Sequence, residues 1–427
     1  MTRAASTLIA ILVTACSGFA FTAAATTTTA TTTSTTTTTV PPTTTTTLPL
    51  VDVSGTVIAD TGRPVVGAMV AFGDATALTA ADGSFRMATT RPGPITVTKS
   101  GWSDLEIPWE AGVTVADAVL ERLVIRGLRV SADTASNDAA FQGIIDLAAD
   151  TAVNALVFDS KQEGGKVLYQ TAVGAAHELG AVEALYDPID RLEQAHRAGL
   201  YAITRIVVFE DAYWVSAHPE EKLAGPWVAP TAPGARRYNI DLAVEACSLG
   251  FDEIQFDYVR YPAGQTAQRS GQLDIPQADR VAAIESFLAE ARAALEPLGC
   301  AISADVFAIV VSTIDDQGLG QRPEELSRHL DALSPMIYPS HYSLGWLGFP
   351  DPNDYPYEVT ANAIDAALPR LAAGAVLRPW LQAFWWTNAQ IREAIQAAED
   401  RGIGWIMWNV RSDFHREALP GVEEVGG

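Results

Sequence analysis

Two aspartates in neighbouring apolar stretches are the residues best suited to do chemistry in this chain. Asp257 lies near the end of residues 253–258, and Asp305 lies at a similar depth in residues 301–307. A carboxylate within apolar sequence is costly to bury unless it is paired. Two such groups on neighbouring strands suit glycoside hydrolysis, in which one attacks or stabilises the sugar and the other protonates the leaving oxygen.

This chemistry requires opposite protonation states of the two carboxyl groups. Arg260 follows Asp257 closely enough to pair with it after a turn, and that pairing would keep Asp257 ionised, as a nucleophile must be. Asp305 stands between Ala304 and Val306, so desolvation is expected to raise its pKa and let it act as the acid. Two alternatives stay open, a structural Asp257–Arg260 ion pair and a structural or hydroxyl-binding Asp305.

Polar and aromatic residues near the ends of the other apolar runs are candidates for sugar contact. Sugar rings stack on aromatic faces, while the polar atoms of Tyr and Trp bind hydroxyls. Trp380 and Trp405, inside such runs, are expected to pack in the core, and Glu210 or Asp159 is the next candidate should Asp257 not be the nucleophile. The predicted substrate-binding residues are Asp159, Lys161, Arg205, Arg260, Tyr338, His341, Trp385, Trp408 and Asn409.

Other chemistries have weaker support in the sequence. The six His residues have no paired-ligand spacing, and no phosphate-cradling glycine loop is present, so neither a metal nor a cofactor is predicted. Against 28 Lys and Arg stand 51 Asp and Glu, a net charge of −23 that argues against nucleic acid as a partner and favours neutral or cationic ligands.

The elements that must position these residues form a repeating pattern in the last 300 residues or so of the chain. Short β-branched or aromatic runs alternate with helical stretches, which predicts an α/β fold of the (β/α)8 TIM-barrel type. An open doubly wound sheet is the alternative, but no Gly-x-Gly-x-x-Gly follows the first run. The eight runs are 125–130, 155–159, 202–208, 253–258, 301–307, 336–338, 379–384 and 404–409.

The junctions of this pattern carry further predictions. Gly199, Gly250, Gly299 and Gly402 stand where each helix should end before the next strand, as C-cap glycines do. Cys247 and Cys300 precede neighbouring strands on the same side, so their Cα atoms could come within about 7 Å, and we expect a disulfide between them. Because function in a barrel lies at the carboxyl ends of strands, the candidate residues should surround one mouth.

The first fifty residues predict export. Residues 1–25 read as a signal peptide, with Arg3 before the apolar residues 8–13 and small residues up to Ala25. Residues 13–16 also resemble a lipobox, which would place a lipid anchor on Cys16; cleavage near Ala25 is the alternative. Residues 26–50 form a Thr/Pro-rich linker that cannot bury a core. The expected location is therefore secreted or anchored at the cell surface.

In residues 51–120 the sequence consists of short runs in which apolar and polar residues alternate, separated by turn residues. One of these turns, Asp82-Gly83, predicts a hairpin. About seven strands are expected, in a small all-β sandwich. Ser54-Gly55-Thr56-Val57, the segment 64–70 and the segment 79–85 with its phrase ADGSF resemble the carboxypeptidase-regulatory-like domain. That resemblance implies a spacer or adhesion module.

Residues 121–427 are the expected barrel domain, of which roughly residues 126–409 resemble a TIM-barrel family of glycoside hydrolases once classed as a domain of unknown function. The resemblance rests on segments 125–130, 154–161 and 202–211, and above all on GFDEIQFDYVRYP at 250–262. It implies a carbohydrate-active fold without naming a sugar, and by analogy with retaining barrels it gives Asp257 the role of nucleophile and Asp305 that of acid. Together with the export signal, this predicts a secreted glycoside hydrolase of an extracellular or cell-envelope polysaccharide. Amylase-type enzymes use Glu as the acid, so the Asp puts retention of configuration in question. An inactive glycan-binding barrel that organises the cell envelope is the alternative.

Overall fold

The computed structural model describes residues 49–425. The expected signal peptide, the lipid site at Cys16 and nearly all of the Thr/Pro-rich linker lie outside the described residues.

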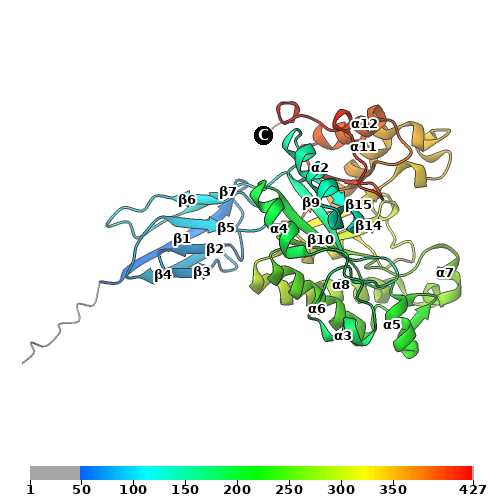
Figure 1. Ribbon diagram of the computed structural model, residues 1–427, viewed down its shortest axis with the longest axis horizontal. Coiled ribbons are helices and arrows are strands. Elements are labelled where there is room, and N and C mark those ends of the chain that lie inside the picture. The colour runs from blue at the N-terminus through cyan, green and yellow to red at the C-terminus, as the bar shows by residue number, and fades with distance from the viewer. Residues whose placement is uncertain (1–48, 426–427) are drawn as a thin grey trace, which may run out of the picture. The chain divides into compact units, whose positions relative to one another are not determined.

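Seven short strands follow, and they form two small sheets with one shared hydrophobic core (Figure 1). Alternate residues are buried, for example Val53 and Val57 in the first strand, as expected for sheets with one face on a core. One sheet has the order β4 (Ser84–Thr89), β1 (Val51–Ala59), β7 (Ala118–Leu120), and the other β3 (Ala75–Leu78), β2 (Met69–Phe72), β5 (Ile95–Thr98), β6 (Leu105–Ile107).

The predicted hairpin at Asp82-Gly83 is wrong in one respect. The segment does turn there, with Gly83 at a φ of 77° and the Asp82 carboxylate accepting the Ser84 backbone N–H at 3.0 Å. However, the flanking strands β3 and β4 belong to different sheets. The turn therefore carries the chain from one sheet to the other, a difference that turn residues alone do not reveal.

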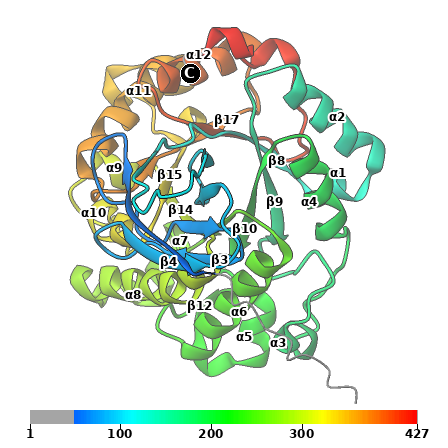
Figure 2. The same cartoon turned by 90° about the vertical axis from the view of Figure 1, so that its left-hand side faces the viewer.

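The rest of the chain is a closed barrel of eight parallel strands, which confirms the predicted fold class (Figure 2). Neighbouring strands pair around the ring, and β18 pairs with β8 to complete it. The strands are β8 (Arg126–Val130), β9 (Ala155–Lys161), β10 (Tyr201–Val207), β13 (Glu253–Asp257), β14 (Ala301–Phe307), β15 (Ala332–Ile337), β17 (Trp380–Gln382) and β18 (Trp405–Trp408).

Seven of the eight strands differ from their predicted bounds, and β15 differs most because it contains a proline. β15 begins at Ala332 rather than 336 and contains Pro335 opposite Val306 of β14. A proline within an apolar run argues against a central strand, so the sequence pattern did not predict that β15 begins before Pro335. Before Pro379, a two-residue strand, β16 (Val376–Leu377), also pairs with β15.

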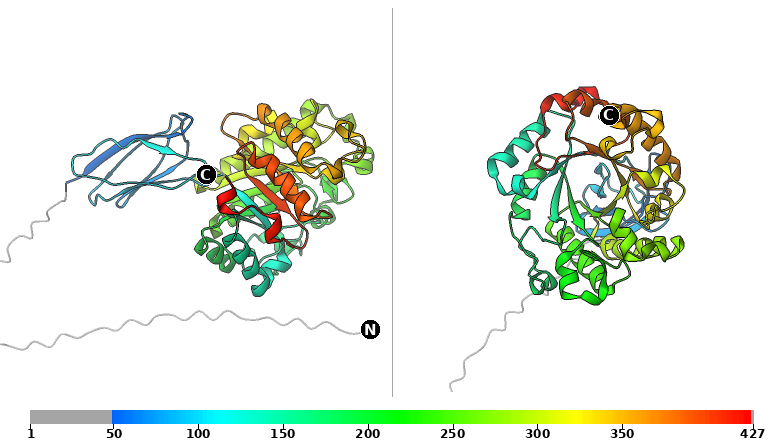
Figure 3. Two further views of the ribbon diagram at one scale, coloured as in Figure 1. Left: turned by 90° about the horizontal axis from the view of Figure 1, so that it is seen from above. Right: turned by 90° about the vertical axis from the view of Figure 1, so that its right-hand side faces the viewer.

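Helices surround the barrel strands (Figure 3). Gly199, Gly250, Gly299 and Gly402 have φ values of 73°, 112°, 86° and 62°, left-handed conformations that end these helical stretches as predicted. Among the described residues, no helix has the length and apolar character needed to cross a membrane. The longer helices are α2 (Asp138–Ala149), α4 (Pro188–Arg197), α6 (Pro233–Leu249), α8 (Gln277–Leu295), α11 (Pro356–Ala367) and α12 (Asn388–Glu399).

Shorter elements occupy the connections between these units. They are α1 (Ala132–Ser136), α3 (Gly174–Glu178), α5 (Ala212–Ala217), α7 (Gly264–Ser270), α9 (Ile309–Ser312), α10 (Pro323–Leu326) and the two-stranded ribbon β11 (Lys222–Ala224) and β12 (Trp227–Val228).

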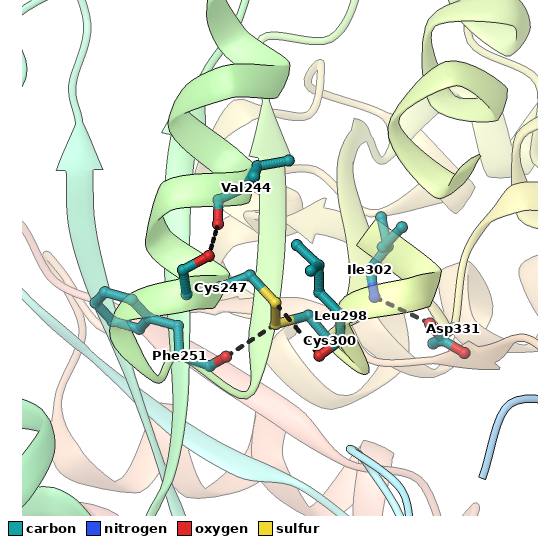
Figure 4. Close-up of a disulfide and its surroundings, with 8 residues drawn as sticks. Val244, Cys247, Phe251, Leu298, Cys300, Ile302 and Asp331 are labelled. Atoms are coloured by element: carbon teal, nitrogen blue, oxygen red, sulfur yellow. Dashed lines mark hydrogen bonds between the residues drawn. A yellow bond between two sulfur atoms is a disulfide. The ribbon is translucent and has the colours of Figure 1, made fainter. Parts of the chain in front are cut away.

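A disulfide joins Cys247 to Cys300, as predicted (Figure 4). Their Cα atoms are 6.1 Å apart, within the normal range for this bond. Cys247 lies in the last turn of α6 and Cys300 directly precedes β14. The bond therefore fastens a helix to the amino-terminal end of a neighbouring barrel strand.

Candidate active site

A cavity of about 480 Å³ opens at the carboxyl ends of the barrel strands. Both Asp257, the last residue of β13, and Asp305, in β14, line it. Its walls are rich in aromatic residues from several strands and loops. These are Tyr258, Phe307, Tyr338, Tyr342, Trp346, Trp380 and Trp408.

Strand alternation explains why β13 carries its acid into the barrel. Phe256 packs its ring 5.3 Å from that of Phe287 on helix α8, on the outer side of the strand. Successive side chains of a strand point to opposite faces, so Gln255 and Asp257 face inward. Gln255 donates accordingly to Ser334 on β15 at 3.2 Å.

Asp257 is held by Arg205 rather than by Arg260, which corrects the expected pairing. Its Oδ2 accepts hydrogen bonds from Nε and Nη2 of Arg205 at 2.8 and 2.6 Å, and its Oδ1 accepts the Tyr258 backbone N–H at 2.6 Å. Tyr258 has a φ of 51°, a left-handed conformation uncommon for a residue of this size. The chain turns there, and Arg260 donates to the Tyr261 carbonyl at 3.0 Å instead.

Arg205 lies at the centre of a buried charge cluster. Besides Asp257, it pairs with Glu163 and, at 3.2 Å, with Asp159. Asp159 is shared with Arg129 and is 1% exposed, so it lies beneath the cavity wall. One guanidinium thus links the ends of β9, β10 and β13, as its five donors in a planar fork allow.

Asp305 has a different environment. Its Oδ1 accepts a hydrogen bond from the Trp380 indole N–H at 2.7 Å, and its Oδ2 is buried without a partner among the described residues. Burial raises the pKa of Asp305 well above its usual range, and the negative charge of Asp257 raises this pKa further. Asp305 therefore keeps its proton to a higher pH than an ordinary carboxyl group.

Several predicted contact residues do line this cavity. They include Tyr338 and His341, whose rings meet edge to face at 5.5 Å, and burial lowers the pKa of His341. The guanidinium carbons of Arg129 and Arg205 lie 4.3 and 4.9 Å from the ring centroid of Trp408. The predicted contact residues that line the cavity in the structure are Arg205, Arg260, Tyr338, His341 and Trp408.

Three other predicted residues lie away from the cavity. Lys161 is fully buried, and its Nζ pairs with Asp211 at 2.8 Å. Asn409 donates from its side chain to the Ala383 carbonyl at 2.7 Å. Trp385 is 81% exposed and borders a separate hollow of about 170 Å³ together with Asn409.

The structure also brings in residues that the sequence did not single out. Glu163 follows the end of β9 and lines the cavity. Burial would raise the pKa of Glu163, but Arg205 holds it below the usual range. Trp380, expected in the core, is buried and also lines the cavity. The signal for Glu163 was its place just after a strand end. Glu210, the reserve candidate, instead accepts the Gly164 backbone N–H at 2.7 Å.

Comparisons with known proteins point to carbohydrate hydrolysis. A family described as "Putative glycosyl hydrolase domain" matches residues 127–414, more than half of the chain. No curated protein has a significant sequence match.

Of three similar solved structures, the first shares the fold at a TM-score of 0.50. The glycoside hydrolase domain of PgaB (BpsB) from Bordetella bronchiseptica is 14% identical, with 68% of this chain and 95% of that chain covered and a TM-score of 0.50. A hypothetical protein from Ruminiclostridium thermocellum is 32% identical, with 42% and 97% covered and a TM-score of 0.36. The glycoside hydrolase domain of PelA from Pseudomonas aeruginosa is 10% identical, with 68% and 96% covered and a TM-score of 0.41.

Proposed function

The chain belongs to the glycosyl hydrolase family that matches residues 127–414, and from this premise we propose a secreted hydrolase that cleaves an extracellular or cell-envelope polysaccharide with Asp257 and Asp305. One observation carries the proposal: two carboxyl groups with opposite surroundings face one cavity. Asp257 is bound by the Arg205 guanidinium, while Asp305 is desolvated, which favours its protonated form.

Asp257 is the proposed nucleophile or base. Arg205 directs two N–H groups at Oδ2, whereas Oδ1 receives a single backbone N–H. In a retaining reaction Oδ1 attacks the anomeric carbon and forms a glycosyl ester, which water then hydrolyses. In an inverting reaction the same carboxylate takes a proton from the attacking water. Proton NMR of the first product formed, read for its anomeric configuration, distinguishes the two routes.

Asp305 is the proposed acid. Its unpartnered Oδ2 is the atom that would carry the proton, because the Trp380 indole N–H already occupies Oδ1. The proton passes to the glycosidic oxygen as the C–O bond breaks, so the sugar leaves as an alcohol. Trp408 and Tyr338, in the walls of the same cavity, offer ring surfaces for the sugar and a hydroxyl for its polar groups.

Export is part of the proposal and is supported by the Cys247–Cys300 disulfide, since disulfides persist in oxidising compartments. Mass spectrometry of the mature protein from its native host tests it. Cleavage near Ala25 or a lipidated Cys16 at the new amino terminus would each support export, and an intact residue 1 would contradict it.

The function itself is tested with a panel of polysaccharides and the purified protein. We expect reducing ends to appear with at least one polysaccharide, and Asp257→Asn to abolish this release. Asp241→Asn, at a half-exposed site on α6, serves as the matched control and should keep full activity. Turnover by Asp257→Asn equal to wild type would overturn the assignment of Asp257.

A further inference from the structure

Arg260 lines the cavity and forms no direct ion pair with any carboxylate among residues 49–425. Its side chain is buried, with 6% of the residue exposed. It makes one side-chain hydrogen bond among the described residues, from Nη1 to the Tyr261 carbonyl at 3.0 Å, and its Nε is buried without a partner. The edge formed by Nε and Nη2 therefore has no hydrogen-bond acceptor within residues 49–425.

The other buried arginines show how unusual this is. Residues 49–425 contain six more, and each forms an ion pair with at least one carboxylate. Since burying a charge is costly unless it is paired, an unpaired buried guanidinium needs another explanation. The six paired arginines are Arg126, Arg129, Arg191, Arg205, Arg280 and Arg378.

Aromatic rings hold the Arg260 guanidinium in place. Its carbon lies 4.6 Å from the ring centroid of Trp227, 4.9 Å from that of Tyr258 and 4.3 Å from that of Phe307. Such contacts stabilise a cation without satisfying its N–H groups. Burial lowers the pKa of Arg260 to about 10, which still leaves it charged at neutral pH. The rings thus position a cation whose hydrogen-bonding edge is unoccupied.

We propose that Arg260 binds the carboxylate of an acidic sugar, so that the substrate is a polysaccharide containing uronic acids or similarly carboxylated residues. This inference rests on the proposed hydrolysis in the same cavity. A carboxylate matches the planar fork of a guanidinium with two parallel hydrogen bonds, whereas a sugar hydroxyl fills one.

The charges around the cavity are compatible with an anionic group there. Glu163 and Asp257 face the cavity and both form ion pairs with Arg205, and burial raises the pKa of Asp305 well above its usual range. The net charge of −23 therefore describes the whole chain and not the surroundings of Arg260. Over a few ångströms in a desolvated site, a direct ion pair outweighs distant surface charges, which salt screens.

Wild-type protein and matched substrates test the specificity. A panel of uronic-acid polysaccharides is used in native form and after chemical reduction of each carboxyl group to a hydroxymethyl group, which keeps the linkages. We expect kcat/KM to be about 10- to 100-fold higher for the native form, as for a hydrogen-bonded charge pair. Equal cleavage of the reduced form, still abolished by Asp257→Asn, would overturn this inference and leave the proposed hydrolysis standing.

Variants locate the effect. Arg260→Gln should remove most of the preference for the native form, and Arg260→Lys should keep part of it because a single charge remains. Arg237→Gln, an exposed site on α6, is the control and should keep the full preference. An unchanged preference in a folded Arg260→Gln protein would overturn the assignment to Arg260.

Binding provides a readout that needs no cleavage. Calorimetry with methyl glucuronide and methyl glucoside, and with the corresponding galacturonide and galactoside, compares acidic and neutral sugars on wild-type protein. We expect at least one acidic sugar to bind about 10-fold more tightly than its neutral partner. Equal affinities in both pairs would overturn the inference whether or not any polysaccharide is cleaved.

Discussion

The two ends of strand β13 each bury a carboxylate, and the comparison separates structure from chemistry. At the start of the strand, Glu253 pairs with Arg378, accepts a hydrogen bond from Ser303 and has the Tyr201 hydroxyl at 3.3 Å. Both of its oxygens thus have several protein donors. The cluster lies at the amino-terminal end of the barrel, close in sequence to the Cys247–Cys300 disulfide.

At the end of the same strand, Asp257 faces a cavity of about 480 Å³. In the same cavity, the buried Asp305 Oδ2 and Arg260 Nε have no hydrogen-bond partner in the part of the chain that the structure describes. The comparison teaches that a buried acid in a barrel strand is no sign of catalysis by itself. What matters is whether the acid has a carboxyl neighbour across a cavity: Glu253 is paired with Arg378, whose own Nε also lacks a partner among the described residues, whereas Asp257 and Asp305 line one cavity at the carboxyl ends of the strands.

The largest expected effect is a loss of activity at Asp257, the carboxylate at the end of β13. Asp257→Asn should lower kcat/KM by more than about 10⁴-fold on a confirmed substrate, because the amide is neither nucleophile nor base. Steady-state kinetics of the purified variant measure this effect. Residual activity within about 10-fold of wild type would show that the two ends of β13 do not differ in the proposed way.

Asp305→Asn should show a substrate-dependent loss. Cleavage of the natural linkage should fall by about 10²–10⁴-fold, the usual contribution of general acid catalysis, while an aryl glycoside with a good leaving group should be largely spared. Kinetics on both substrates measure the difference. An equal loss on the two would contradict the acid role.

The same variant should change stability in a pH-dependent way. Because the folded-state pKa of Asp305 is raised above the ordinary value, its ionisation disfavours the folded protein as pH rises from that ordinary value towards the folded-state value. Asn cannot ionise, so Asp305→Asn should gain thermal stability relative to wild type at pH 8 but little at pH 3. A gain independent of pH would contradict the raised pKa.

Glu253→Gln should lower the stability of the protein and leave its activity nearly unchanged. It leaves the Arg378 charge buried without its partner and should cost about 3–5 kcal/mol in the free energy of unfolding, while kcat of the folded fraction stays near wild type. Urea denaturation measures the cost. The double variant with Arg378→Met removes both charges and should recover part of this loss; no recovery would argue against a structural ion pair.

Removal of the disulfide also tests whether the amino-terminal end of the barrel contributes to stability and not to activity. Cys247 and Cys300 are 53 residues apart in sequence, so replacing both with Ser should lower the free energy of unfolding by about 2–4 kcal/mol. Activity at 25 °C should remain. A large loss of kcat in the folded variant would mean that the amino-terminal end of the barrel also sets the geometry of the cavity.

The smallest expected effect is a shift in pH dependence. The Trp380 indole N–H lowers the pKa of Asp305 against burial, so Trp380→Phe should raise this pKa further. Since the acid must be protonated, the alkaline limb of kcat/KM should move to higher pH. A shift to lower pH would contradict the assignment of Asp305 as the acid.

Much of the fold could be predicted because its signals are local. Apolar runs, helix periodicity and C-cap glycines all lie within short windows, and they predicted eight barrel strands and placed Asp257 and Asp305 on neighbouring ones. The strand β15 was misjudged at its start because Pro335 interrupts the local pattern.

The partners of the acids could not be predicted in the same way. Arg205 reaches Asp257 because β10 and β13 pair side by side, with Val207 opposite Asp257, a register that the sequence does not state. Arg260 follows Asp257 by three residues, yet the left-handed turn at Tyr258 leads its chain elsewhere. Proximity in sequence therefore suggested the wrong pair, and strand register determined the right one.

The closure of the barrel has a consequence for how the protein matures. β18 is the last strand of the ring and pairs with β8, the first, and the Arg129 side chain donates to the Asn409 carbonyl 280 residues further on. Trp408, in a wall of the cavity, belongs to that last strand. A chain emerging from its amino terminus therefore cannot assemble the cavity until nearly all of the barrel is present, and contacts of such long range make folding slow. Catalytic competence should appear late and in one step, which would keep incomplete chains inactive.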